Sequence, residues 1–126
     1  MKEVWADIYG YEGKYQVSTW GRVRNQNKIL SPYKNSKGYL KVGLCRDGET
    51  HKFRVNRLVA NTFIPNYANQ CEVNHIDGNK DNNSVTNLEW VTPNQNREHE
   101  REFIAKIEFG IEACRRLHYG DDDDDE

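Results

Sequence analysis

The segment of this chain best equipped for chemistry contains one histidine among amide side chains. Residues 73–83 have the sequence Val-Asn-His-Ile-Asp-Gly-Asn-Lys-Asp-Asn-Asn, and residues 87–93 have the sequence Asn-Leu-Glu-Trp-Val-Thr-Pro, with Asn96 close behind. Hydrolysis of a phosphodiester requires a nucleophilic water, a cation near the developing negative charge and a stabilised leaving oxygen. A two-metal site usually needs several carboxylates, so this amide-rich pattern favours one divalent metal and a histidine base.

His75 is the candidate base, because a neutral imidazole can take a proton from water near neutral pH. Asn74 and Asn96 can each offer an amide oxygen to a hard cation such as Mg²⁺ or Mn²⁺. Asn96 falls in the first turn of an expected helix, where the helix N-terminus also favours a phosphate. A histidine considered alone is more often structural than catalytic, so both interpretations of His75 stay open at this point.

Two strands and a loop would bring these residues together. The pattern predicts strands over residues 73–75 and 85–91, joined by an asparagine-rich loop. Asn87 is placed to hold this loop, and with it the His75 ring, by hydrogen bonds. The remaining asparagines of the loop are expected to be turn residues: Asn79, Asn82 and Asn83.

A helix is predicted to follow the second strand. Thr92 is a favourable N-cap and Pro93 suits the first helical position. An apolar stripe continues this helix toward residue 119, formed by Phe103, Ile107, Ile111 and Cys114. Residues 120–126 are a glycine followed by acidic residues, and we expect them to form a disordered acidic tail.

The first 54 residues are predicted to form a small antiparallel sheet. The clearest hairpin runs from Tyr39 to Arg46, turns at Asp47-Gly48 and returns to Val55. Its alternation places Val42 and Leu44 on an apolar face and basic residues on the outer face, namely Lys41, Lys52 and Arg54. Helical spacing then predicts a helix over residues 55–63 that packs under the sheet and ends before Pro65.

Charge is distributed unevenly along the chain. The net charge is −2, but six of the 20 acidic residues lie at 121–126, and without them 18 basic residues face 14 acidic ones. Between residues 14 and 57, eleven Lys or Arg residues stand against two acidic ones. Such a block attracts polyanions, although a solvated strand face is the ordinary alternative. The candidate DNA-binding residues are Arg22, Arg24, Lys34, Lys41, Lys52, Arg54, Arg57 and Lys80; for Lys80 a solvated loop position is an equal alternative.

Several classes of protein are disfavoured by composition. Mean hydropathy is −1.00, and no apolar run approaches the length of a membrane span. The first residues lack the apolar stretch of a signal peptide, so we expect a cytoplasmic protein. The cysteines form no Cys-x-x-Cys pair, which predicts reduced, mostly buried thiols and no structural zinc. The tryptophans are expected to be core anchors rather than base-stacking platforms: Trp5, Trp20 and Trp90.

Three blocks of sequence, in their expected order, resemble HNH endonucleases of the phage and intron homing type, in the variant that ends in Asn. Residues 73–96 resemble their HNH motif. Residues 5–18, Trp-Ala-Asp-Ile-Tyr-Gly-Tyr-Glu-Gly-Lys-Tyr-Gln-Val-Ser, and 21–23, Gly-Arg-Val, resemble the nuclease-associated module that precedes this motif. Arg-Leu-Val-Ala at 57–60 and Phe-Ile-Pro-Asn at 63–66 match the usual connector. The resemblance covers nearly all of residues 3–99.

This resemblance implies a ββα-metal fold that cuts or nicks DNA with one divalent metal, Mg²⁺ or Mn²⁺. By the same resemblance His75 is the general base, Asn87 the structural asparagine and Asn96 a metal ligand. The residue before the histidine is the other ligand, often Asp in this family, and here it is Asn74. His99 is either an auxiliary ligand or phosphate contact, or a surface residue of the helix.

We therefore expect an α+β protein. A β-rich DNA-binding module at 1–54 precedes a connector helix and loop at 55–70, an HNH ββα-metal unit with its C-terminal helix at 71–119, and the tail. The expected function is metal-dependent hydrolysis of double-stranded DNA, in the cytoplasm of a bacterial host if the protein is phage-encoded. The alternative is a catalytically weakened DNA-binding protein of the same fold. The sequence predicts no membrane partner and leaves the oligomeric state open.

Overall fold

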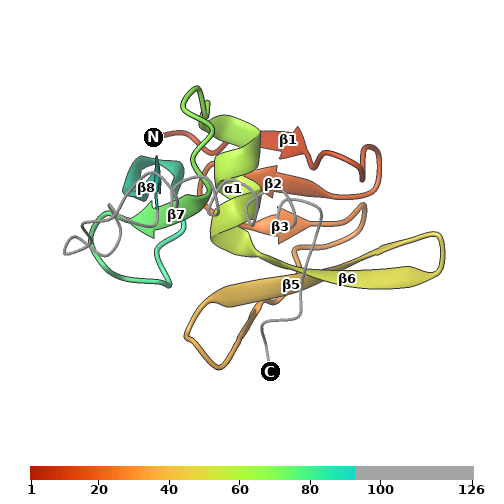
Figure 1. Cartoon of the computed structure of the whole chain (residues 1–126). Coiled ribbons are helices and arrows are strands. Elements are labelled where there is room, and N and C mark those ends of the chain that lie inside the picture. Colours follow the sequence, from red (N-terminus) through yellow and green to blue (C-terminus); the bar gives the residue numbers. More distant parts are fainter. Residues whose placement is uncertain (93–126) are drawn as a thin grey trace.

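The protein is described from a computed structural model, in which residues 1–92 are placed; the segment 93–126 is not described (Figure 1). Three small antiparallel sheets and one α-helix make up the described part. The helix predicted from Thr92 onward, with Asn96 and His99, lies outside the described residues, as does the acidic tail. None of the described helices has the length and apolar character needed to cross a bilayer.

The first two sheets are built from the N-terminal half of the chain. The first contains β1 (Trp5–Asp7), β2 (Gln16–Ser18) and β3 (Val23–Arg24), in that order. The second contains β4 (Tyr33–Lys34), β5 (Leu40–Arg46) and β6 (Glu49–Arg54). The β5–β6 hairpin turns at Asp47-Gly48, both with positive φ, which confirms the predicted hairpin.

The third sheet is the two-stranded ribbon of β7 (Glu72–His75) and β8 (Leu88–Val91). Residues 85–87, predicted as the start of the second strand, instead form a single 3₁₀ turn, Val85–Asn87. Asn87 has its backbone N–H bonded to the carbonyl of Ser84, so the chain turns before it can enter the ribbon. The predicted strand therefore begins three residues late.

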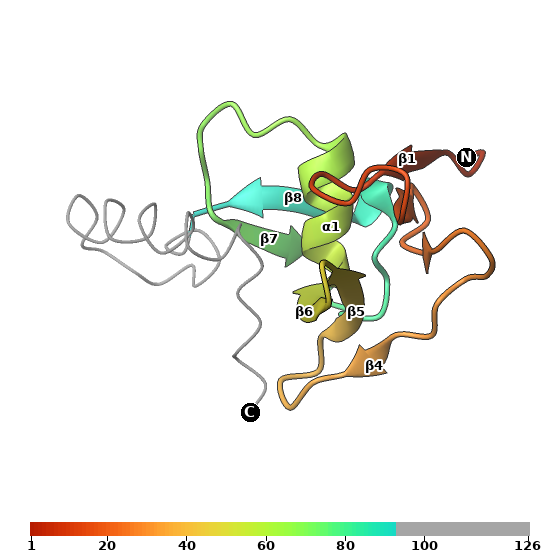
Figure 2. The same cartoon turned by 90° about the vertical axis from the view of Figure 1, so that its right-hand side faces the viewer.

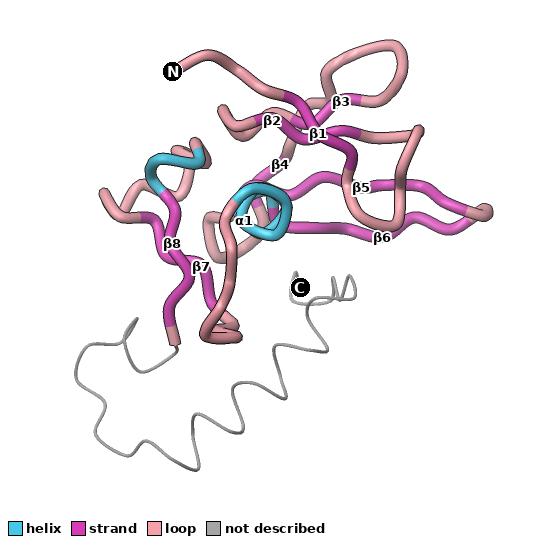
Figure 3. The backbone as a smooth tube through the Cα atoms, turned by 90° about the horizontal axis from the view of Figure 1, so that it is seen from above, coloured by secondary structure: helices cyan, strands magenta, loops and turns pink. Residues whose placement is uncertain are grey.

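Helix α1 (Val55–Phe63) lies at the centre of the molecule and contacts strands of all three sheets (Figures 1 and 3). Val55, Leu58 and Val59 form its buried stripe, and the chain leaves the helix just before Pro65. Side chains of this kind contribute about 1.5–3 kcal/mol each when they are fully buried. The predicted bounds of this helix are confirmed. Besides connecting the two halves of the chain, it packs against all three sheets of the described fold.

A single hydrophobic core joins the N-terminal sheets to the β7–β8 ribbon. It includes Val17 and Leu44 from the N-terminal half and Val73, Leu88 and Trp90 from the ribbon. The indole N–H of Trp90 also donates to the carbonyl of Ile64, 3.0 Å away, which fixes the ribbon to the end of α1. The expected role of Trp90 as a core anchor is confirmed.

The N-terminal half also contacts the loop that joins β7 to β8. The backbone N–H of Val85 donates to the carbonyl of Thr19 at 2.8 Å. Gly21, with φ +89°, lies so close to this loop that a Cβ there would come within 2.7 Å of the Asn83 carbonyl oxygen. Only glycine satisfies both the backbone conformation and this approach, so this loop is shaped partly by residues more than sixty positions earlier.

Several predictions about burial were wrong. Lys41 lies on the predicted face of β5 but is only 1% exposed, because Tyr33 and Arg54 flank it on the neighbouring strands. Trp20 is 48% exposed and is no core anchor; Trp5 is partly buried, and Trp90 is buried as expected. Cys45 is exposed, since it lies near the end of β5 beside the hairpin turn, whereas Cys71 is buried.

Candidate active site

His75 ends strand β7 on the buried face of the ribbon, with 6% of its surface exposed. Its Nε2 donates a hydrogen bond to the side-chain oxygen of Asn83, 2.7 Å away. An amide oxygen can only accept, so the neutral ring carries its proton on Nε2 and keeps a lone pair on Nδ1. The fold therefore orients the ring and selects the tautomer in which Nδ1 can act as a base.

Asn87 holds the loop between the strands, as expected from the sequence. Its side-chain oxygen accepts from the backbone N–H of Asp77 at 3.1 Å. Its amide nitrogen donates to the Asp77 carboxylate and to the carbonyl of Asn82, both at 2.9 Å. Asn87 is 8% exposed, so these three bonds satisfy a buried side chain and set the path of the loop up to Asn83.

Asp77 is the charged residue of this loop network. Its carboxylate accepts from the backbone N–H of Asn79 at 2.8 Å and from the side-chain amides of Asn82 and Asn87. These hydrogen bonds favour the ionised form and hold the pKa of Asp77 below its ordinary value, with the Asn79 bond as the largest cause and His75 as a small Coulombic one.

Asn74 and His75 point to opposite faces of the ribbon, because consecutive residues alternate along a strand. On the outer face Asn74 is paired directly with Glu89 of β8. The side-chain nitrogen of Asn74 donates to a Glu89 carboxylate oxygen at 2.9 Å. Glu89 is exposed and Asn74 half-buried, so the pair lies in reach of solvent.

The donor atoms at this position suit a hard divalent cation. With its NH₂ bonded to Glu89, Asn74 has its amide oxygen as the atom to offer, beside a carboxylate. Within residues 1–92, no group of three or more His, Cys, Asp or Glu side chains is arranged to hold a metal. The amide oxygen of Asn74 fits the amide-rich pattern of the sequence.

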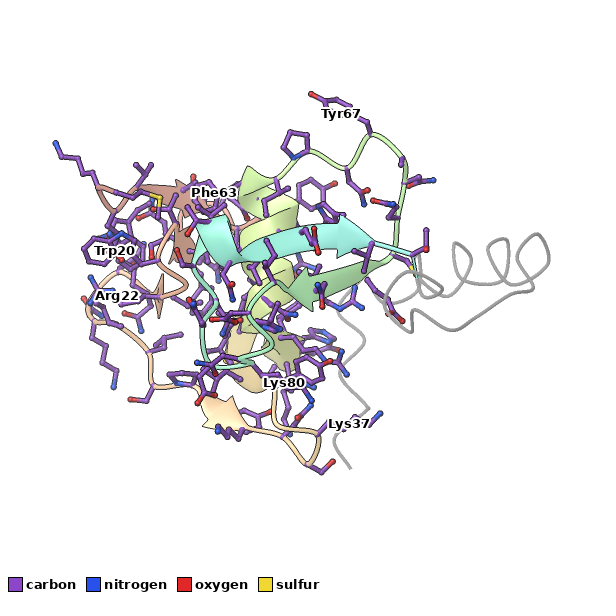
Figure 4. All side chains as sticks on the ribbon, turned by 90° about the vertical axis from the view of Figure 1, so that its left-hand side faces the viewer. Trp20, Arg22, Lys37, Phe63, Tyr67 and Lys80 are labelled. Atoms are coloured by element: carbon purple, nitrogen blue, oxygen red, sulfur yellow. The ribbon has the colours of Figure 1, made fainter. Side chains whose placement is uncertain are left out.

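Two cations lie over the ring of Tyr39, which is an aromatic neighbour of His75. The Tyr39 ring centre is 6.1 Å from that of His75, and the Arg54 guanidinium lies 4.2 Å from the Tyr39 ring centre. The Lys80 ammonium lies 4.5 Å from the same ring centre and donates to the carbonyl of Lys37 at 2.8 Å (Figure 4). Lys80 is thus an anchored lysine rather than a loosely solvated one, and a basic site borders the candidate base.

The other predicted DNA-binding residues fall into separate groups. Arg24 ends β3, and Arg22 directly precedes this strand; both lie over the Trp5 ring, and Arg22 pairs with Glu3. Figure 4 shows Arg22 beside Trp20. Lys34 forms an ion pair with Asp81 at 3.2 Å, and Lys52 lies 6.0 Å from the Tyr33 ring centre. Figure 2 shows the strand of Lys34, β4, beside β5. Arg57 donates to the carbonyl of Cys71 at 3.1 Å, and Lys41 is buried.

Three residues of this site were missed by the sequence reasoning. Asn83 was expected to be a turn residue but is 5% exposed and bonded to His75. Tyr39 gave no signal, because its proximity to His75 depends on how the second sheet meets the ribbon. Glu89 could have been found by pairing the two predicted strands in register, since that pairing places it opposite Asn74.

Comparisons with known proteins identify two motifs in this chain and several relatives. Residues 3–45 match the NUMOD4 motif, and residues 54–98 match the HNH endonuclease model. The chain is 46% identical over 98 residues to DNA endonuclease I-HmuI of Bacillus phage SP01, covering 76% of this chain and 56% of that protein. It is 33% identical over 88 residues to H-N-H endonuclease F-TflII of Escherichia phage T5, covering 67% of this chain and 46% of that protein.

A solved structure gives the same fold. The structure describing DNA binding and cleavage by the HNH homing endonuclease I-HmuI aligns with a TM-score of 0.72 at 46% identity, over 75% of this chain and 56% of that one. This chain therefore spans only about half the length of the two relatives. The α+β architecture, the order of the two matched motifs and the identity to I-HmuI lead to one conclusion: the chain belongs to the HNH homing endonuclease family, with a NUMOD4 motif preceding the HNH unit.

Proposed function

We propose that this protein is a metal-dependent endonuclease that hydrolyses phosphodiester bonds of double-stranded DNA, with His75 as general base. Family membership and the identity to I-HmuI support the substrate and the reaction class. The observation that carries the role of His75 is its hydrogen bond to Asn83, which leaves Nδ1 as the basic ring nitrogen. A positioned base of this kind accelerates hydrolysis by about 10²- to 10⁴-fold.

In this proposal some of the described residues orient the base, and others supply positive charge near the phosphate. Nδ1 of His75 removes the proton of the attacking water, while Asn83 prevents the ring from turning. Asn87 maintains the loop that carries Asn83. Arg54 and Lys80, which lie over the Tyr39 ring beside His75, would contact the phosphate that is attacked.

The metal would be held by the oxygen donors of Asn74, together with Asn96 from the undescribed segment. When bound, a divalent ion such as Mg²⁺ or Mn²⁺ supplies positive charge to the phosphate and its leaving oxygen. Four other basic residues, three exposed and one half-buried, would contact the DNA backbone on either side, which positions the duplex without reading its sequence: Arg22, Lys34 and Lys52, with Arg24 half-buried.

A second candidate function is a DNA-binding protein of the same fold with weakened catalysis. The observation that favours it is the amide at position 74, because a neutral ligand attracts a divalent cation less than a carboxylate does. The two functions differ in one measurable property, since only the endonuclease breaks DNA strands.

Nicking of supercoiled plasmid distinguishes them. We expect the wild-type chain to nick plasmid with Mg²⁺ or Mn²⁺, to be inactive with EDTA, and to lose about 10²- to 10⁴-fold in rate in His75→Ala. His51→Ala, which removes a histidine from the β5–β6 hairpin, is the matched control and should retain activity. Binding of the plasmid without nicking under either metal would support the weakened protein instead.

A further inference from the structure

The pair formed by Asn74 and Glu89 places a carboxylate where the chain would otherwise have only an amide. The two residues are direct partners in the β7–β8 register, and their side chains are joined by a hydrogen bond of 2.9 Å. Direct partners in an antiparallel ribbon project from the same face. Glu89 is exposed, so its negative charge is not consumed by a buried network.

Other described carboxylates near the site are less suited to a cation. Both carboxylate oxygens of Asp77 accept hydrogen bonds inside the loop, so this group is committed to loop structure. Glu72 is on the same face of the ribbon as Asn74, but it lies two residues further from the loop and is paired with Val91. Glu89 is thus the described carboxylate that is hydrogen-bonded to the Asn74 side chain, through its amide nitrogen.

We propose that Glu89 supplies the carboxylate of the metal site, and that Asn74 and Glu89 together replace a single acidic ligand at position 74. Glu89 accepts a hydrogen bond from the NH₂ of Asn74, which leaves the amide oxygen of Asn74 as the atom that would bind the metal. The second carboxylate oxygen of Glu89 adds the negative charge that an amide lacks. Hard divalent cations prefer such oxygen sets. This inference rests on the proposed endonuclease function, but it concerns the source of charge rather than the existence of the activity.

Direct measurement of metal binding tests this role. The full-length chain in a His75→Ala background, bound to a DNA duplex that it leaves intact, is titrated with Mn²⁺ alone, and free Mn²⁺ is followed by its solution EPR signal. Glu89→Gln should weaken Mn²⁺ binding by about 10- to 100-fold, the range found when groups that support a metal site are removed. Glu72→Gln removes the same charge from the same face and should change the affinity less than twofold, by an order-of-magnitude expectation for a charge that does not contact the metal.

A restoring variant separates ligation from folding. Asn74→Asp combined with Glu89→Gln returns a carboxylate to position 74 and should recover most of the lost Mn²⁺ affinity. Unchanged Mn²⁺ binding in Glu89→Gln, or equal losses in Glu89→Gln and Glu72→Gln, would overturn the role of Glu89. If the wild-type chain still nicks plasmid in that case, the proposed function stands and only this inference fails; absence of both Mn²⁺ uptake and nicking would reject the two together.

Discussion

The two faces of the β7–β8 ribbon carry the two halves of the candidate site in opposite environments. The inner face holds His75, which is buried and bonded to Asn83. The outer face holds Asn74 and Glu89, which are bonded to each other and accessible to solvent. His75, the proposed base, is therefore oriented by contacts in the core. Asn74, one residue earlier in β7, is a proposed metal ligand and is oriented by its cross-strand partner Glu89.

The proposed base is thus fixed by buried contacts, whereas the proposed metal ligands are exposed or half-buried. The orientation of His75 on the inner face depends on contacts with the loop, the first sheet and α1, so it requires many residues to be correctly placed. The outer face depends on one cross-strand pair. Substitutions should therefore affect the base through structure and the metal site through local charge.

The largest effect on the inner face is expected at Asn83. Asn83→Ala removes the acceptor of the His75 ring proton, and we expect the nicking rate to fall by about 10- to 100-fold, part of what a positioned base provides. Asn83→Asp keeps an acceptor but adds a negative charge that stabilises the protonated ring. The acid limb of its pH–rate profile should therefore move to higher pH, as measured by nicking rates across pH.

The two Asn83 variants also separate orientation from stability. Thermal unfolding is measured for both, and Mn²⁺ binding should be retained because the metal ligands lie on the other face. A pH profile of Asn83→Asp identical to that of the wild type would contradict the hydrogen bond as the device that sets the base.

A smaller effect is expected where the first sheet meets the loop, at Gly21. Gly21→Ala adds a Cβ that would lie 2.7 Å from the Asn83 carbonyl oxygen, on a backbone with φ +89°. Gly48→Ala is the matched control, since Gly48 has φ +79° and no atom within 4 Å of its Cβ position. Gly21→Ala should therefore be less stable than Gly48→Ala by about 1–3 kcal/mol, the usual range for overpacking.

Chemical unfolding measures that difference, and nicking assays show whether it reaches His75. We expect the nicking rate of Gly21→Ala to fall several-fold, on the order of the penalty for a displaced catalytic group, while Gly48→Ala keeps wild-type activity. Equal stability and activity of the two variants would show that the first sheet does not shape the catalytic loop.

The smallest effect is expected in the acid dependence of stability at Asp77. Its pKa is lowered in the folded state, so its hydrogen bonds stabilise the fold above the ordinary Asp pKa, and this contribution is lost as the pH falls through the folded pKa. Denaturant midpoints measured over about pH 2–5, where carboxylates titrate, should therefore fall less steeply in Asp77→Asn than in the wild type. Parallel curves for the two proteins would remove Asp77 from the acid response.

Much of the fold could be predicted because its signals are local. The Asp47-Gly48 turn, the hairpin of β5 and β6 and the helical spacing over 55–63 each lie within one short segment, and each is confirmed. Two of the errors share one cause, which is contact between separate segments. Lys41 is buried by neighbours on both adjacent strands. The chain forms a 3₁₀ turn at Val85, whose N–H donates to Thr19. Neither the burial of Lys41 nor this turn can be predicted from the residues next to it in sequence.

The candidate site divides in the same way. Asn87 was assigned to the loop from its spacing, and its hydrogen bonds confirm that placement. The role of Asn83 could not be separated from that of neighbouring asparagines, because a turn asparagine and a buried one look alike in sequence. The assignments of Asn96 and His99 lie outside the described residues and stay predictions.

The sequence by itself determined the chemistry available: one histidine, amide oxygens, a basic block, and the HNH motif that joins them. Only the tertiary structure decided which nitrogen of His75 is basic, which carboxylate adjoins Asn74 and which cations border the site. The physical reason is that residue type and spacing specify a local conformation, whereas a tautomer, a cross-strand partner and a shared aromatic ring depend on where separate segments meet. In this protein the separate segments contact one another around α1, whose buried stripe packs against strands of all three sheets.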